Sequence, residues 1–84
     1  MTAFTVEWTR EAMRDLRALH PEVQLRVVRK VERAKQDPLR YFERLKGDKA
    51  WRLRVGDWRV LADIVLTERK VVVATVGHRR NVYR

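Results

Sequence analysis

The stretch WRLRVGDWRVLADI, residues 51–64, determines the fold, because apolar and polar residues alternate on both sides of a central Gly56-Asp57 pair. Alternation with a period of two residues is typical of half-buried strands. A two-residue hairpin loop requires a positive φ, which glycine adopts readily. The stretch therefore predicts a β-hairpin with Gly56-Asp57 as its loop.

The predicted hairpin has an apolar face and a basic face. Its register places Arg54 directly opposite Arg59, with Arg52 on the same face and Val55 opposite Trp58. Like charges opposite each other destabilise a sheet by a few tenths to about 1 kcal/mol. We therefore expect an anion, such as a phosphate backbone, to bind the basic face. The alternative is a set of ordinary surface arginines compensated by nearby carboxylates.

Upstream of the hairpin, the sequence predicts one strand and two helices. Residues 4–8 alternate with period two, whereas the apolar residues between 9 and 36 recur at helical spacing. His20-Pro21 separates the two helices, because the residue before a proline is driven out of the α region and proline fits a first helical turn. Residues 9–36 therefore form a predicted helical hairpin.

The remaining segments complete an α+β fold. Residues 39–49 are predicted to be a connection whose large side chains fill the core, namely Tyr41, Phe42 and Leu45. A loop near 67–69 leads to a last strand over 70–78, and a two-residue loop there would place His78 beside Arg59. The order is β-α-α-β-β-β, with the helical hairpin packed on one face of a mainly antiparallel four-stranded sheet. The sequence does not indicate which strand pairs with the first strand.

Length and composition set further bounds. A chain of 84 residues with 45% hydrophobic and 37% charged residues fits a single domain, residues 1–84, with a charged exterior. The sequence has no cysteine, which excludes a disulfide framework, a thiolate nucleophile and a zinc ribbon. We expect no metal and no cofactor. Neither a secretory signal nor a membrane-spanning run is present, so we expect a soluble cytoplasmic protein with no membrane partner.

The charge points to an anionic partner. The formal net charge is +9, and fifteen of the twenty basic residues are arginine. Residues 43–84 hold eleven bases and five acids, which gives +6 for this half. Arginine binds phosphate through two parallel hydrogen bonds, so the excess favours nucleic acid, with an acidic protein partner as the alternative.

Metal-free cleavage of RNA is one reaction that a basic face could support, because the 2′-OH of the substrate is then the nucleophile. The reaction needs a proton acceptor, a proton donor and cations on the phosphate. Arginine serves only the last role well, since it stays protonated. His78 and Tyr83 are the candidates for proton transfer, beside the basic residues that follow the last strand, Arg79 and Arg80.

Three segments resemble the RelE/ParE superfamily of type II toxin–antitoxin toxins: Leu45-Lys46-Gly47, residues 51–64, and VVVATVGHRRNVYR at 71–84. The length and the helical hairpin agree, so the resemblance extends over essentially the whole chain. It implies a compact, microbial RNase-like fold. It also implies a cognate antitoxin similar to RelB. We predict that this partner is acidic, that its C-terminal segment wraps the helical hairpin and the sheet edge, and that it lays an amphipathic helix against Leu25 and Val28.

Resemblance to the RelE branch implies cleavage of mRNA in the ribosomal A site, without a metal ion. The basic strand positions of that branch correspond to Arg52, Arg54 and Arg59, and its later residues to Arg79 and Tyr83. By this analogy Arg59 and Arg79, both expected at the surface, stabilise the transition-state phosphate. Tyr83 stacks on a base or transfers a proton, and His78 is its rival. Lys46 and Arg80 are implied RNA contacts.

Resemblance to the ParE branch implies a different activity, in which a toxin of the same fold binds DNA gyrase and has no RNase chemistry. A non-toxic RNA-binding relative is a further alternative. The retained arginines and Tyr83 favour the RelE branch.

Overall fold

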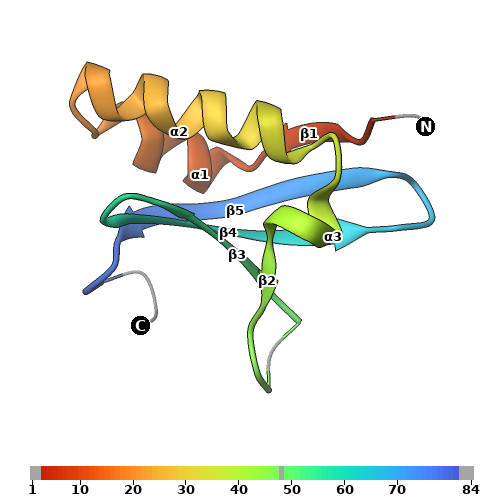
Figure 1. The fold of residues 1–84 in the computed structure, drawn as a ribbon. Coiled ribbons are helices and arrows are strands. Elements are labelled where there is room, and N and C mark those ends of the chain that lie inside the picture. Colours follow the sequence, from red (N-terminus) through yellow and green to blue (C-terminus); the bar gives the residue numbers. More distant parts are fainter. Residues whose placement is uncertain (1–2, 48, 82–84) are drawn as a thin grey trace.

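Five strands form one mixed sheet, and two helices cover one of its faces (Figure 1). The computed structural model describes residues 3–47 and 49–81. The elements in chain order are β1 (Thr5–Trp8), α1 (Arg10–Arg17), α2 (Pro21–Ala34), α3 (Pro38–Tyr41), β2 (Glu43–Arg44), β3 (Trp51–Val55), β4 (Trp58–Val65) and β5 (Lys70–His78). The predicted α+β class is confirmed, with the strands in the order β1-β5-β4-β3-β2.

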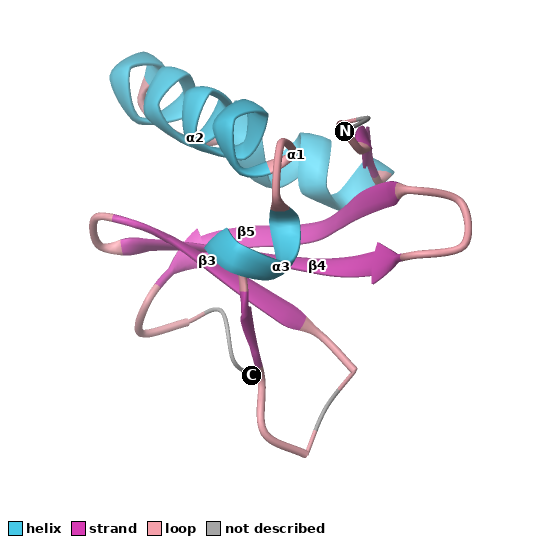
Figure 2. Cartoon of the chain, turned by 45° about the vertical axis from the view of Figure 1, so that its right-hand side comes forward, coloured by secondary structure: helices cyan, strands magenta, loops and turns pink. Residues whose placement is uncertain are grey.

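The predicted helical hairpin is present, and local hydrogen bonds explain where its helices begin. Thr9 Oγ1 accepts from the backbone N–H of Ala12 at 3.1 Å and caps α1. His20 Nδ1 accepts from the N–H of Glu22 at 3.2 Å, and Pro21 occupies the first position of α2. Both helices lie on the same side of the sheet in two views (Figures 1 and 2).

The sheet has five strands instead of the predicted four, because the connection between the helical hairpin and β3 contains the short strand β2. Glu43 lies opposite Arg52 and Arg44 opposite Trp51. A strand of two residues is too short to show a period in the sequence. The sequence did not indicate a partner for the first strand. In the structure β1 pairs in parallel with β5, with Thr5–Trp8 against Lys70–Val73.

Only one of the three side chains expected to fill the core from this connection does so. Phe42 is buried, whereas Tyr41 is 40% exposed and Leu45 is half-buried. Tyr41 ends α3 and Leu45 follows β2, so neither side chain is enclosed between the layers. The core lies between α1, α2 and the sheet, and its largest enclosed side chains are Leu53, Val27, Val31, Val60, Val71, Val73 and Pro38.

The predicted register of the central hairpin is confirmed: Val55 lies opposite Trp58, and Arg54 opposite Arg59. Gly56 has the expected positive φ, 60°. Because Val55 faces the core, the alternation directs Arg54 to the other face of the sheet.

The predicted register of the last strand is wrong. β4 ends at Val65 opposite Lys70, so four residues instead of two connect the strands. A bulge then shifts the pairing between Leu61 and Ala62, so that His78 lies opposite Trp58 and not opposite Arg59. A bulge inserts one unpaired residue and thereby exchanges the faces of the residues after it. No helix in the described part of the chain is both long and apolar enough to span a membrane.

Candidate functional site

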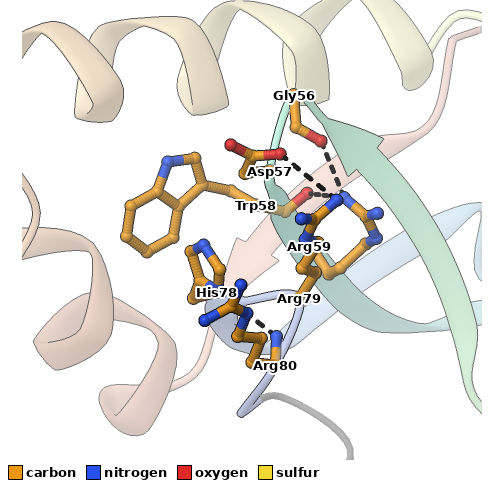
Figure 3. A network of polar contacts seen from close by, with 7 residues as sticks. All are labelled: Gly56, Asp57, Trp58, Arg59, His78, Arg79 and Arg80. Atoms are coloured by element: carbon orange, nitrogen blue, oxygen red, sulfur yellow. Dashed lines mark hydrogen bonds and ion pairs between the residues drawn. The ribbon is translucent and has the colours of Figure 1, made fainter.

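The tip of the β3–β4 hairpin meets the segment that follows β5, and this junction forms the candidate site (Figure 3). The backbone N–H of Arg79 donates to the carbonyl of Asp57 at 2.9 Å. The Arg79 guanidinium also lies 3.7 Å from the Asp57 carboxylate, and its side chain is 52% exposed. The hairpin loop therefore fixes the backbone of Arg79 while the charged end of its side chain reaches solvent.

Arg59 is buried, contrary to the expectation of a surface position: only 7% of it is exposed. Its Nη1 donates to the carbonyls of Gly56 at 2.8 Å and Trp58 at 2.9 Å (Figure 3). These bonds fold the side chain back onto its own hairpin loop. Arg59 thus combines a structural role with a fixed positive charge at the hairpin tip.

The other two arginines of the basic face differ in their surroundings. Arg54 is exposed and lies opposite Arg59, as predicted. Arg52 forms a hydrogen-bonded ion pair with Glu43 across the β2–β3 pair. The hydrogen bond from Arg52 and its positive charge lower the pKa of the Glu43 carboxyl below its ordinary value. At neutral pH, Glu43 therefore compensates part of the charge of Arg52.

His78 lies with Trp58 and away from the basic face, because of the shifted register of β5. The two rings meet edge to face, with centroids 5.3 Å apart and planes at 88°. His78 Nδ1 accepts from the backbone N–H of the exposed Arg80 at 3.3 Å. The histidine therefore contacts the hairpin and the segment after β5.

One predicted contact residue, Lys46, lies away from the hairpin tip. Lys46 is exposed in the turn between β2 and β3, which lies at the Trp51 end of β3, whereas Gly56 follows the other end. A hollow of about 630 Å³ adjoins Lys46 and is also lined by Arg44 and Lys49. Tyr83 lies outside the described residues.

Sequence reasoning missed a second group of bases, on α2. Four of them line a cavity of about 310 Å³ together with Arg54. They are Arg26, Arg29, Lys30 and Arg33. Their spacing of three and four residues places them on one side of a helix, and this signal could have been found in the sequence.

The described geometry can bind a phosphate group. Arg54 and Arg79 present charged groups to solvent, and Arg59 adds positive charge behind them. Within residues 3–47 and 49–81, no group of three or more histidine, aspartate or glutamate side chains is arranged to hold a metal ion. A small basic α+β domain with arginines at the tip of its central hairpin is thus defined.

This class of domain matches a known family. Residues 6–83 match the model of the ParE toxin of the type II toxin–antitoxin system parDE. The chain belongs to the RelE/ParE superfamily of type II toxin–antitoxin toxins, as its sequence predicted. No protein of curated function matches it in sequence.

Solved structures of toxin–antitoxin proteins are similar to the chain. The RelBE2 complex of Mycobacterium tuberculosis contains a chain of 31% identity and TM-score 0.87, with 93% of this chain and 100% of that chain covered. The intact RelBE complex of E. coli contains a chain of 20% identity and TM-score 0.76, with 90% of this chain and 96% of that chain covered. A chain from the chromosomal ParDE system of P. aeruginosa has 15% identity and TM-score 0.69, with 90% of this chain and 96% of that chain covered. The last two show a shared fold.

Proposed function

We propose that this toxin is a ribosome-dependent endoribonuclease that cleaves mRNA in the ribosomal A site and stops translation. The observation that carries the proposal is the pair of exposed guanidinium groups, Arg54 and Arg79, at the tip of the hairpin beside the buried Arg59. The 31% identity to the chain from the M. tuberculosis RelBE2 complex supports the same branch.

The proposed reaction is attack of the 2′-OH on the adjacent phosphate. The 2′-oxygen loses its proton and forms a bond to phosphorus, and the bond from phosphorus to the 5′-oxygen breaks. A proton donor supplies hydrogen to the departing 5′-oxygen, which leaves a 2′,3′-cyclic phosphate. Arg79 and Arg59 would stabilise the extra negative charge of the pentacovalent transition state, while Arg54 would hold the neighbouring backbone.

Proton transfer is assigned to Tyr83 on the basis of the resemblance. His78 is the weaker candidate, because its ring lies against Trp58 on the other face of the sheet from Arg54. A site without a strong base depends on substrate geometry that is imposed from outside, and the ribosome would supply it. Free RNA should therefore be cleaved poorly. Lys46, Arg52 and Arg80 are assigned to backbone contacts.

Inhibition of DNA gyrase is the second candidate, and the match to the ParE family model favours it. In that case the arginines at the hairpin tip would not act on a phosphate. Substitution of Arg79 would then leave toxicity intact.

Two assays on the purified protein separate the candidates. The first adds the protein to ribosomes programmed with a defined mRNA and maps new 5′ ends by primer extension. The second follows supercoiling and linearisation of plasmid DNA by gyrase. Cleavage at A-site codons that Arg79→Ala abolishes supports the endoribonuclease. Trapped gyrase–DNA complexes without mRNA cleavage would overturn it.

We also propose an acidic antitoxin as the partner, since the similar chains of M. tuberculosis and E. coli form complexes with an antitoxin. Leu25 is 50% exposed on α2, and the partly buried Val28 lies three residues further on. This apolar flank suits an amphipathic helix. A complex in which the antitoxin contacts neither the helical hairpin nor the basic face would contradict the assignment.

A further inference from the structure

A basic groove lies between α2 and the end of β3, apart from the junction of Asp57 and Arg79. It has a volume of about 310 Å³, and we call it the α2 groove. Its charged lining consists of five bases: Arg26, Arg29, Lys30, Arg33 and Arg54. No acidic residue lines it, and among the described residues none of these five bases forms an ion pair with a carboxylate.

The groove exists because β2 is short. β2 pairs only with Trp51 and Arg52, so the remainder of β3 forms an edge of the described sheet beneath α2 (Figure 1). Arg26 closes one end of the groove: a Cβ added to Gly56 would lie 2.9 Å from its Nη2. The hairpin loop and α2 are thus in direct contact at this end.

The concentration of like charge is unfavourable for the isolated chain. Arg26 and Lys30 are four residues apart on α2, as are Arg29 and Arg33, and like charges at this spacing destabilise a helix. Glu32, the acid nearest to Arg33 in the sequence, is paired with Lys35. An anion bound in the groove would relieve this repulsion.

The dimensions and the lining favour a phosphate backbone over an acidic peptide. Arg26 and Arg33 are seven positions apart on α2, a rise of about 10 Å, which is the axial rise of about three nucleotides of one strand. Peptide interfaces depend on apolar anchors in pockets. Val55 is the only large apolar residue in the described lining, and it is buried in the core. Binding in the groove must therefore be chiefly electrostatic, as for a nucleic-acid backbone.

We propose that the α2 groove binds the phosphate backbone of RNA as a second site, continuous with the hairpin site through Arg54. The groove determines affinity and takes no part in bond cleavage. The choice of RNA rests on the proposed function. The groove residues on α2 are then docking residues and not catalytic residues.

The test compares two double variants that remove the same charge. Arg29→Gln with Arg33→Gln alters the groove, whereas Arg10→Gln with Arg17→Gln alters exposed arginines of α1. Binding of the purified protein to a short fluorescein-labelled single-stranded RNA is measured by anisotropy over a range of salt concentrations. The groove variant should bind roughly tenfold more weakly, and its slope of log K against log salt should fall by about 1.4, or about 0.7 for each lost phosphate contact. The α1 variant should change much less.

Three results would overturn the groove as an RNA site. One is equal weakening of RNA binding in both variants, which would show a general charge effect. Another is unchanged RNA binding in the groove variant. The third is loss of binding to poly-L-glutamate with RNA binding retained, which would identify an acidic peptide as the occupant. Binding to free RNA is measured without ribosomes, so failure of mRNA cleavage would refute the proposed function and leave this test intact.

A kinetic readout separates docking from chemistry. On programmed ribosomes, the groove variant should require a higher concentration for half-maximal cleavage, with an unchanged maximal rate. A lower maximal rate would instead place the α2 residues in the chemical step.

Discussion

Asp15 of α1 accepts a hydrogen bond from the backbone N–H of Val76 in β5, with 3.0 Å between Oδ2 and N. β1 pairs with β5 only as far as Val73, so this N–H lies beyond the parallel pair. Thr9 Oγ1 donates to the carbonyl of Ala74 at 3.0 Å, at the bulge. Helix α1 and its cap residue Thr9 thus replace β1 as the partner of β5 and hold the bulge that sets the direction of His78.

Asp15→Ala should destabilise the protein, because the partly buried N–H of Val76 loses its acceptor. An unsatisfied buried donor costs about 1–3 kcal/mol, which urea unfolding would measure. Asp15→Asn keeps an oxygen acceptor and should cost less. Arg14→Ala, an exposed change on the same helix, is the control. Equal stability of the Asp15→Ala and Arg14→Ala proteins would show that the bond is not significant.

Arg59→Ala should also lower the free energy of unfolding, by at least about 1.5 kcal/mol, since a charged group loses its hydrogen bonds to Gly56 and Trp58. Arg54→Ala, at the exposed residue opposite, should change stability by less than about 0.5 kcal/mol. Reduced cleavage by Arg59→Ala must therefore be corrected for the folded fraction. If thermal unfolding of the two variants coincides, the guanidinium of Arg59 does not stabilise the loop.

Arg79→Ala tests transition-state stabilisation without this complication. Its ion pair with Asp57 is half exposed and contributes little to stability. Single-turnover cleavage on programmed ribosomes should fall by roughly 10²–10³-fold, the scale for loss of one such donor. Arg10→Ala on α1 should retain the wild-type rate. Wild-type toxicity of Arg79→Ala in cells would refute the role.

Glu43 should give the stability of the β2–β3 pair a pH dependence. Its pKa is lower in the folded chain than its ordinary value of 4.5, chiefly because of Arg52. The folded state is therefore favoured above pH 4.5, and this contribution is lost as the pH falls through the lowered pKa. Urea unfolding should show Glu43→Gln less stable than wild type at pH 7, with the difference vanishing in acid. A difference that is the same at both pH values would contradict the ion pair.

The central hairpin was predictable because its register depends on local features: the alternation of residues 51–64 and the φ requirement at Gly56. The position of His78 was not, because it depends on a bulge that Thr9 and Asp15 stabilise from more than sixty residues away in the sequence. The burial of Arg59 was also hidden, since an alternating strand gives the face of a side chain but not its conformation.

In the proposed endoribonuclease reaction, Tyr83 and His78 are the two candidates for the proton acceptor. General-base loss costs about 10²–10⁴-fold in many enzymes. Because His78 lies on the Trp58 side of the sheet, its replacement by alanine should have the smaller effect. Tyr83→Phe should reduce single-turnover cleavage on programmed ribosomes by at least about tenfold.

The pattern of variants distinguishes the possible roles of these two residues. If Tyr83→Phe cleaves at the wild-type rate while Tyr83→Ala does not, the ring acts by stacking on a base and the hydroxyl transfers no proton. If His78→Gln is the more damaging change, His78 is the base. In that case the substrate must reach the Trp58 side of the sheet, and the resemblance to the RelE branch does not extend to its proton acceptor.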